Sequence, residues 1–510
     1  MTTEGSCGSL MQSFVLKVMV NGEFMSDLLG ESAVEIAARV KSLEVSAEEV
    51  VEATLAGIER TAPHLNAFMH IDPDGARAAA RELQRRLRAG EDVGALAGVP
   101  TAMKDLYNTY PGWPSTFGGA LPPSAFIADT ASTYPRRMEA AGAIMVGATN
   151  SPALGFRGTC DNAIFGATSN PFDLQRNSGG SSGGSAAAVG AGLLAIADGT
   201  DGGGSIRIPS AWSGTFGFQP TFGRVPLVLR PNAFGGTAPF VYEGPITRTV
   251  ADAALALTAL SGRDRLDPYS LPDTVDWNAS LNAGIRGKRI GYTRDFGVFA
   301  VDPRIAAGVE ASLSAFERQG AIIVPLDVEL PHSQAELSDL WSRMISAGNL
   351  AAVEGFAYAG LDMRPQLPEP VVRWMDVAAA ATPRDLRRDQ MVRTEVFGRV
   401  EGLFDEVDFV VSPTVGALPI HNLDNGRTVG PSEIDGVAVD PLIGWCLTYL
   451  TNFSGHPAAS LPGGLIDGLP FGIQIIAPRY ADADLMSACA RFEEAAPWEW
   501  IYRELAPELY

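Results

Sequence analysis

The sequence predicts an α/β protein, built from helices and buried strands that alternate along the chain. Short apolar segments with the length of buried strands recur in both halves, and amphipathic segments with the length of helices separate them. A chain of 510 residues is also long enough to bury a large core. Helices and strands that alternate in this way are typical of a layered fold, with helices packed on a sheet.

The first half begins with two helices between residues 32 and 62. Ser46 and Glu49 have the spacing of a capping box, which predicts the start of the second helix. The remaining elements expected before the glycine-rich segment are a strand at 65–72, a helix at 73–89, a buried strand at 98–104, a loop at 111–124, a helix at 130–141 and a strand at 143–149.

The second half resumes the alternation after a loop-rich region at 227–243, a helix at 249–261 and a polar linker at 263–282. The expected strands lie at 288–293, 321–326, 407–411 and 471–477. The expected helices lie at 303–319, at 333–350, within 368–404 and at 482–495. These elements alone do not show whether the two halves share one sheet.

The net charge and the metal-binding residue types exclude several classes of function. The net charge is −21 and the isoelectric point is near 4.7, which argues against a surface that binds nucleic-acid phosphates. The four cysteines lie far apart and disfavour a disulfide framework or a zinc site, and the five histidines form no metal-binding motif. We therefore expect no metal, no cofactor and no nucleic-acid partner.

Residues 1–25 are expected to form an N-terminal extension. The apolar stretch at 10–20 is short, is interrupted by Lys17, and lacks the basic start and the cleavage site of a secretory signal. No other stretch approaches the length of a membrane span. The sequence therefore predicts a cytoplasmic protein that has no membrane partner.

The segment 179–226 is rich in glycine and serine, and it carries Ser181 and Ser205 at the two ends of a small-residue helix. Glycine at this density is unfavourable unless the backbone must approach something closely or adopt unusual conformations. The three glycines before Ser205 would present consecutive backbone N–H groups, which suits an anion or a developing oxyanion. Two serines beside such a loop indicate acyl transfer.

Two other motifs match this segment and are rejected on their context. The pattern G-x-S-x-G fits around Ser181 and Ser182, but the residues before it form a polar loop, whereas a nucleophile elbow follows an apolar strand. The pattern G-x-G-x-x-A at 190–195 has no strand leading into it and no helix beginning there. A packing helix is therefore favoured over a dinucleotide site.

The segments GGSSGGS (179–185) and DGGGSIRIPSAWSGTFGFQPTFGR (201–224) resemble the amidase signature family of serine hydrolases. GVPTAMKD (98–105) fits that family's lysine motif. The resemblance continues through TNSPALG (149–155), GATSNPFD (166–173), GPITRTVADAA (244–254), VSPT (411–414), NFSGHPAASLP (452–462) and GLPFGIQIIAP (468–478), so that it covers about residues 30 to 500.

The resemblance implies one mixed, twisted β-sheet of many strands, covered by helices on both faces. It also implies a single domain at 26–510. Within that domain the signature core would span about 95–260, and a second half at 283–505 would complete the same sheet.

The resemblance assigns a Ser–cis-Ser–Lys triad to this chain. Ser205 corresponds to the acylated nucleophile, Ser181 to the cis-serine that relays protons, and Lys104 to the general base. A serine hydroxyl is a weak nucleophile until a base takes its proton, and lysine can be that base only when it is neutral, a form that burial favours. A hydroxyl donates and accepts together, so Ser181 can pass a proton between the other two.

Residues around the triad are expected to support it. The expected oxyanion donors are the backbone N–H groups of Gly202, Gly203, Gly204 and Ser205. Asp201 and Arg207 flank this loop and are interpreted as a structural ion pair that orients it. Gly155 is small and would leave the acyl side of the site open. The pocket walls are expected from 155–160, from 227–242 and from helices between 335 and 380.

Three positions depart from the family pattern. Ala153 stands where a glutamate is common, Gln219 where a lysine is usual, and Ser178 where a proline often precedes GGSSGG. None of these positions belongs to the triad. They group the chain with divergent stand-alone amidases and leave its substrate open.

We therefore expect a cofactor-independent serine amidohydrolase that cleaves small aryl or alkyl acylamides through a seryl acyl-enzyme. Esters and carbamates fit the same route, because the triad does not discriminate among these leaving groups. The expected partners are the small substrate and water, and a homodimer is an open alternative to a monomer. Two other functions remain open: an amidase-like subunit of a tRNA-dependent amidotransferase, and a glycine-loop anion-binding protein without catalysis.

Overall fold

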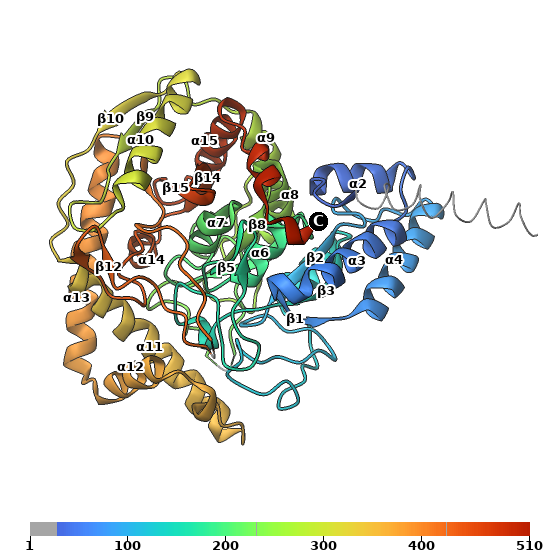
Figure 1. Cartoon of the computed structure of the whole chain (residues 1–510), viewed down its shortest axis with the longest axis horizontal. Helices are drawn as coiled ribbons and strands as arrows, with labels where there is room; N and C mark the ends of the chain where they lie inside the picture. The colour runs from blue at the N-terminus through green and yellow to red at the C-terminus, as the bar shows by residue number, and fades with distance from the viewer. Residues whose placement is uncertain (1–27, 231, 425) are drawn as a thin grey trace, which may run out of the picture.

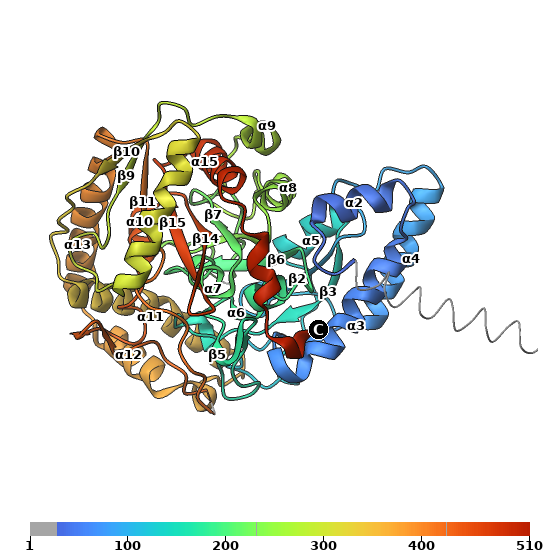
Figure 2. The ribbon, with the colours of Figure 1, turned by 45° about the horizontal axis from the view of Figure 1, so that its top comes forward.

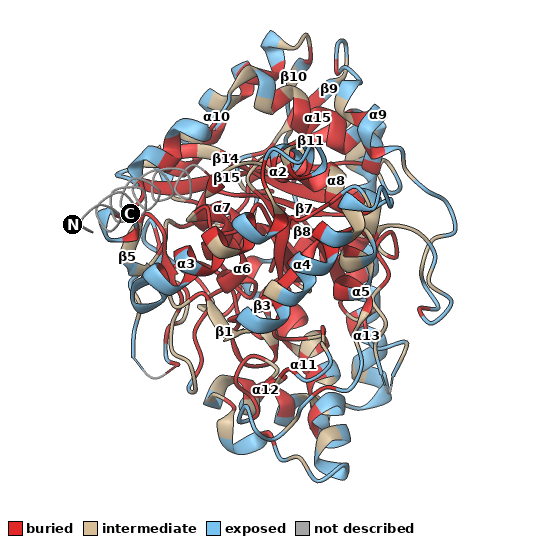
Figure 3. Ribbon diagram, turned by 90° about the vertical axis from the view of Figure 1, so that its right-hand side faces the viewer, coloured by how far each residue is buried: buried red, intermediate tan, exposed pale blue. Residues whose placement is uncertain are grey.

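The computed structural model describes residues 28–230, 232–424 and 426–510. The predicted extension at 1–25 lies outside these residues. Helices α2 to α4 (33–88) stand at one side of the molecule, and helices α11 to α13 (334–402) lie at the other (Figures 1 and 2). Buried residues are concentrated in the middle of the molecule (Figure 3).

An eight-stranded mixed sheet has the strand order β10–β9–β11–β15–β14–β7–β8–β6. Strands β10, β9 and β11 pair in parallel, and the other neighbours pair antiparallel. The strands are β6 (Ile196–Asp201), β7 (Phe216–Gln219), β8 (Tyr242–Thr247), β9 (Arg289–Tyr292), β10 (Ile322–Pro325), β11 (Phe409–Pro413), β14 (Ala458–Ile466) and β15 (Leu469–Ile476). Both halves of the chain contribute strands, which confirms the predicted mixed sheet.

A second sheet of three strands, in the order β1–β3–β2, lies beside β6. Its strands are β1 (Phe68–Ile71), β2 (Pro100–Lys104) and β3 (Ile144–Thr149). The hydroxyl of Thr101 donates to the carbonyl of Ile196 at 3.0 Å, and the N–H of Lys104 donates to the carboxylate of Asp198 at 2.9 Å. Hydrogen bonds that involve side chains therefore join β2 to β6. A ladder of backbone hydrogen bonds at this place would have made the two sheets one.

Helices cover both faces of the larger sheet, as predicted. On β15, Gly472 faces Ala211 of α7, while the ring of the preceding residue, Phe471, lies over Gly308 of α10. Successive residues of a strand point to opposite faces, so α7 and α10 lie on opposite sides of the sheet. Helix α15 packs on α10 through Phe316 and Phe492, whose ring centroids are 4.9 Å apart.

The other elements connect and flank these layers. Helices α2 and α3 both begin at capping boxes, and the predicted one at Ser46 and Glu49 is confirmed. The helices are α2 (Ala33–Lys41), α3 (Ala47–Leu65), α4 (Pro73–Arg88), α5 (Thr133–Ala140), α6 (Gly183–Gly190), α7 (Arg207–Ser213), α8 (Val250–Leu260), α9 (Trp277–Asn282), α10 (Pro303–Arg318), α11 (Gln334–Tyr358), α12 (Glu369–Ala380), α13 (Pro383–Gly402), α14 (Tyr449–Ser454) and α15 (Asp482–Ala495). The short strands are β4 (Ser169–Asn170), β5 (Asp173–Asn177), β12 (Glu433–Ile434) and β13 (Val437–Ala438).

Several elements differ from the sequence prediction. The predicted small-residue helix ends at Gly190, and β6 follows it with the sequence IADGTD, whose polar residues hide its strand character. Strand β8 begins inside the region predicted to be loop-rich, and α9 lies inside the predicted linker. Strand β14 was not predicted. Because β6 and β8 are buried along their whole length, they lack the alternation of apolar and polar residues that marks a half-exposed strand.

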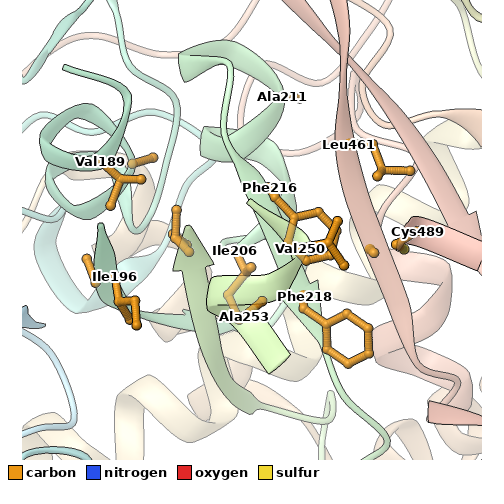
Figure 4. Packing of buried hydrophobic residues seen from close by; sticks show 14 of the residues in the cluster. Val189, Ile196, Ile206, Ala211, Phe216, Phe218, Val250, Ala253, Leu461 and Cys489 are labelled. Carbon is orange, nitrogen blue, oxygen red and sulfur yellow. The ribbon is translucent and has the colours of Figure 1, made fainter. Parts of the chain in front are cut away.

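The core beneath the glycine-rich segment anchors that segment by apolar packing. Figure 4 shows Val189 of α6 and Ile196 of β6 among the side chains of this core, together with Ile206 and Phe216. Ile206 immediately follows Ser205 and is completely buried. The loop that carries Ser205 is therefore held in place by its neighbour in the chain.

Candidate active site

Three segments that are distant in the sequence bring Lys104, Ser181 and Ser205 into one region. Lys104 is the last residue of β2, Ser181 stands just before α6, and Ser205 lies in the loop between β6 and α7. Lys104 is fully buried, whereas Ser181 and Ser205 are 2% and 8% exposed. Ser205 is thus the most accessible of the three, as a residue that meets a substrate must be.

The ammonium group of Lys104 is held by two hydroxyl groups. Its Nζ donates to Ser181 Oγ at 2.7 Å and to Thr200 Oγ1 at 2.9 Å, and the Thr200 carbonyl lies 3.5 Å away. The peptide bond between Gly180 and Ser181 is cis. Lys104 and Ser181 therefore stand in direct contact, in the geometry that proton transfer between them requires.

Ser205 joins this pair through the backbone. The N–H of Ser182 donates to the Ser205 carbonyl at 3.2 Å, which ties the two serine segments together. Within the described residues, the Ser205 hydroxyl makes no hydrogen bond, to Ser181 or to any other group. The structure therefore brings Ser205 beside the pair without a direct link between the two hydroxyl groups.

The glycine loop presents free backbone donors, although not all of those predicted. The N–H of Gly204 donates to Asp201 Oδ1 at 2.6 Å and is therefore engaged within the loop. The N–H groups of Gly202, Gly203 and Ser205 have no acceptor in the part of the chain that the structure describes. Three neighbouring donors remain for a negatively charged oxygen.

A buried ion pair between Asp201 and Arg207 fastens the base of the loop. Arg207 Nε and Nη2 each donate to the Asp201 carboxylate at 3.0 Å, and both side chains are completely buried. Burial alone would raise the pKa of Asp201, but Arg207 and Asn452 outweigh burial and lower it. The remaining donors of Arg207 reach Thr448, Asn452 and Gln474 in the second half of the chain.

Sequence reasoning missed several residues that hold the loop. Thr448 donates to the Gly203 carbonyl at 2.6 Å, and Asn452 donates to Asp201. Trp341 Nε1 donates to the Gly202 carbonyl at 2.8 Å. Thr200 precedes the glycine loop, and its closeness to the motif is the one signal that could have identified it. The other three come from helices and loops far along the sequence. Asn452 begins the segment NFSGHPAASLP of the family resemblance, but nothing in that segment indicates a contact with the glycine loop.

Apolar side chains lie near the glycine loop. A Cβ on Gly155 would lie 2.8 Å from Leu106 Cδ2 and 3.2 Å from Ser181 Oγ, so a side chain at this position would crowd the hydroxyl. The ring of Phe156 lies 6.0 Å from that of Trp341. Ile345 of α11 and Val241 approach Gly202 from the other side, each 3.6 Å from where a Cβ would stand. The region next to the glycine loop therefore suits an apolar substituent.

Burial shifts the proton affinity of Lys104. It lowers the pKa of this lysine from 10.5 to about 7, against the opposing effects of Asp198, Cys160 and Asp201. A substantial fraction of the side chain is therefore neutral near pH 7. A neutral amine beside a serine hydroxyl has the lone pair that a general base requires.

The three departures from the family pattern take structural positions. Gln219 is buried, donates to the His456 carbonyl at 2.8 Å and accepts from the Thr451 hydroxyl at 3.2 Å. Ala153 packs in an apolar cluster next to Phe156. The Ser178 hydroxyl is buried and donates to the carbonyl of Gly179 at 3.4 Å. None of the three intrudes between Lys104 and Ser181.

Comparison with known proteins decides the family. The model of the family named Amidase matches residues 49–486. The chain belongs to the amidase family. The acylamidase of Rhodococcus erythropolis is 35% identical to this amidase over 478 residues, which cover 92% of this chain and 96% of the relative. The crystal structure of a bacterial aryl acylamidase, an amidase signature enzyme, is 48% identical with a TM-score of 0.91, covering 94% of this chain and 99% of that one.

A second kind of relative is also similar to this amidase. One of the subunits of the glutamyl-tRNA(Gln) amidotransferase of Chloroflexus aurantiacus is 34% identical over 483 residues, covering 89% of this chain and 94% of the relative. Together the comparisons confirm the predicted amidase signature fold and the predicted class of reaction, hydrolysis of amide C–N bonds. The described helices include none that combines the length and apolar character needed to cross a bilayer.

Proposed function

We propose that this amidase hydrolyses small aryl or alkyl acylamides through a seryl acyl-enzyme, with Ser205 as nucleophile, Ser181 as proton relay and Lys104 as general base. The observation that carries the proposal is the 2.7 Å contact between the Lys104 amine, whose pKa burial lowers to about 7, and the Ser181 hydroxyl. The free N–H groups next to Ser205 support it as well.

The geometry suggests how the reaction proceeds. Neutral Lys104 takes the proton of Ser181, which in turn takes the proton of Ser205 as its oxygen attacks the amide carbonyl. The N–H groups of Gly202, Gly203 and Ser205 stabilise the oxyanion. The proton then returns through Ser181 to the nitrogen, the C–N bond breaks, and the amine leaves. Water enters and repeats the relay, which releases the acid and restores Ser205.

The substrate class follows from the apolar surroundings and from the relatives. Phe156, Trp341 and Ile345 lie near the nucleophile loop and favour a hydrophobic acyl or aryl group. The bacterial aryl acylamidase, at 48% identity, is named for such substrates. Esters and carbamates pass through the same acyl-enzyme chemistry, so esterase and urethanase activities form part of the proposal.

An amidotransferase component is the second candidate, because the Chloroflexus relative belongs to such an enzyme. The two candidates differ in a simple respect: a stand-alone amidase hydrolyses an anilide when purified alone, whereas an amidotransferase component needs its complex. The third function left open by the sequence, a non-catalytic anion-binding protein, is set aside by the family comparisons. We further propose one domain at 26–510, a cytoplasmic location, and a small amide and water as the partners.

Ser205→Ala tests the nucleophile. The variant should keep its fold and lose at least about a thousandfold of kcat/KM on an anilide, because the remaining residues cannot form the acyl-enzyme. A fluorophosphonate should label wild type at Ser205 and leave the variant unlabelled. Ser210→Ala is the matched control: the hydroxyl of this buried serine of α7 makes no hydrogen bond within the described residues, so its loss should leave turnover near wild type. Turnover by Ser205→Ala above a thousandth of wild type would move the nucleophile elsewhere.

A further inference from the structure

A pair of buried carboxyl groups, Asp198 and Glu243, lies behind Lys104 on neighbouring strands. Strands β6 and β8 are antiparallel, and Thr200 lies opposite Glu243. Asp198 stands two residues before Thr200, so all three side chains are on one face of the sheet. Lys104 Nζ donates to the Thr200 hydroxyl at 2.9 Å, which identifies this as the face toward Lys104.

The carboxyl oxygens of this pair are short of donors. Asp198 Oδ2 accepts from the Lys104 backbone N–H at 2.9 Å and from Asn108 Nδ2 at 2.8 Å. Asp198 Oδ1 and both oxygens of Glu243 have no hydrogen-bond partner among the described residues. The two side chains are 0% and 1% exposed. Buried acceptors need donors, and a proton held between the two carboxyl groups would supply one.

The charges near this pair favour such a shared proton. Burial raises the pKa of Glu243 well above its usual range, and the charge of Asp198 raises it further, against the opposing effects of Asn108 and Arg137. Two carboxyl groups that share a buried space do not both ionise. The charged and titratable groups that face the pair or Lys104 are Arg137 and Tyr134 of α5, Asp201 of β6 and Cys160. Arg137 is engaged by the backbone carbonyls of 260–263, and the charge of Lys104 acts on Asp198 and lowers its pKa against burial.

We infer that Asp198 and Glu243 are positioning residues that share one proton and one negative charge, and thereby set the pH at which Lys104 acts as the base. This inference rests on the proposed function, in which Lys104 is that base. Asp198 anchors the lysine through its backbone N–H. Its single charge stabilises the ammonium that forms when Lys104 accepts the relayed proton.

The proton on Glu243 is as important as the charge on Asp198. If both groups were ionised, two negative charges would hold Lys104 in the ammonium form at neutral pH, and no base would be available. If neither were ionised, burial would act on Lys104 unopposed, and the amine would be too weak a base to take a serine proton. One shared proton places the lysine between these limits.

The pH profile of acylation tests this inference with three variants. In wild type, kcat/KM for an anilide should rise with pH around a midpoint near 7, the pKa of Lys104. Asp198→Asn removes a negative charge near the lysine, so its midpoint should fall by about one pH unit or more. At pH 6 the rate relative to its own plateau then rises about fivefold, from about a tenth to about a half.

The two Glu243 variants separate proton sharing from mere packing. Glu243→Gln carries an amide that can donate to Asp198 as the protonated acid does, so its midpoint should stay within about 0.3 pH units of wild type. Glu243→Leu removes that donor, which favours protonation of Asp198, and its midpoint should move toward that of Asp198→Asn. An unchanged midpoint in Asp198→Asn, or equal shifts in the Gln and Leu variants, would overturn the inference.

Infrared spectroscopy provides a measurement that does not depend on turnover. The spectrum of wild type minus that of Glu243→Gln at pH 8 should contain the carbonyl band of a protonated carboxyl group. The same band should appear when Ser205→Ala is compared with Ser205→Ala/Glu243→Gln. Absence of the band overturns the shared proton even if Ser205 is the nucleophile. Conversely, a band with an active Ser205→Ala variant would refute the proposed function and leave the carboxyl pair intact.

Discussion

Strand β6 carries two buried aspartates with opposite behaviour, one in its middle and one at its end. Asp201, at the end next to the glycine loop, meets the guanidinium of Arg207 in a two-point contact, and its pKa is lowered despite burial. Asp198, three residues earlier, has no such guanidinium contact, and burial raises its pKa. Both side chains are completely buried in the same strand.

The partner, and not the depth of burial, decides what each of these buried carboxyl groups can do. A bidentate arginine makes Asp201 a permanent anion, which suits a residue that fastens a loop. Asp198 lies near a lysine and a second carboxyl group and can be protonated more easily, which suits a residue that adjusts the proton affinity of a base. One strand thus supplies a fixed anchor and a titratable neighbour to the same site.

Removal of Arg207, the cation that pairs with Asp201, should have the largest effect on stability. Arg207→Met leaves Asp201 as a buried charge without its partner, which costs about 3–5 kcal/mol in the free energy of unfolding. Activity should be lost with the loop geometry. Chemical denaturation measures the first effect and anilide hydrolysis the second. Asp408→Asn, which breaks the more exposed pair with Lys288, is the control and should cost about 1 kcal/mol or less. A similar cost in both variants would contradict the comparison.

Removal of Lys104, the cation near Asp198, should leave the fold intact and abolish amide hydrolysis. Lys104→Met leaves Asp198 free to take up a proton, so no charge is left stranded and the midpoint of denaturation should change less than in Arg207→Met. Turnover of an anilide should fall about a hundredfold more than turnover of the matching activated ester, because only the amine needs a proton in order to leave. Equal losses on both substrates would show that Lys104 does not supply that proton.

A third buried carboxyl group, that of Asp252, extends the comparison to the pH dependence of stability, where a smaller effect is expected. Asp252 of α8 accepts the Val34 N–H at 3.1 Å, and burial raises its pKa to about 7. The folded state therefore holds this proton more tightly than the unfolded state, whose value is near 3.8. The resulting stability is fully present below pH 3.8 and is lost as the pH rises through about 7.

Asp252→Asn keeps an acceptor for Val34 and cannot ionise. Its unfolding free energy should therefore fall less than that of wild type between pH 5 and 8, with an advantage on the order of 1 kcal/mol at pH 8. Thermal denaturation at several pH values measures this difference. Asp408→Asn is again the control and should gain no stability at pH 8. A variant that is less stable than wild type at pH 8 would contradict the assigned protonation of Asp252.

Local motifs could predict which residues make up the candidate site but not what surrounds them. The glycine-rich segment and the lysine motif identify Lys104, Ser181 and Ser205, because each motif is contiguous in the sequence. The carboxyl pair depends on the register of β6 and β8. The sequence places β6 within the predicted small-residue helix and predicts no strand at β8, since neither has a period-2 pattern. The pair could not be found without these two strands.

Long-range contacts explain the rest of what the sequence could not provide. Thr448 and Asn452 reach the glycine loop from α14 and the residue before it, and the engagement of the Gly204 N–H depends on how Asp201 is turned by Arg207. Such contacts produce no recognisable pattern in the spacing of residues along the sequence. The alternation of helices and strands was sufficient to predict the layered architecture, because this alternation is repeated many times along the chain.

The fastening of the glycine loop by residues of the second half has a consequence for protein synthesis. The loop at 202–205 leaves the ribosome long before Thr448, Asn452 and Gln474, the residues that hold its carbonyl groups and its ion pair. A nascent chain that lacks them carries Ser205 without the contacts that hold its loop. We therefore expect the loop to take its final geometry only after almost the whole chain has been translated.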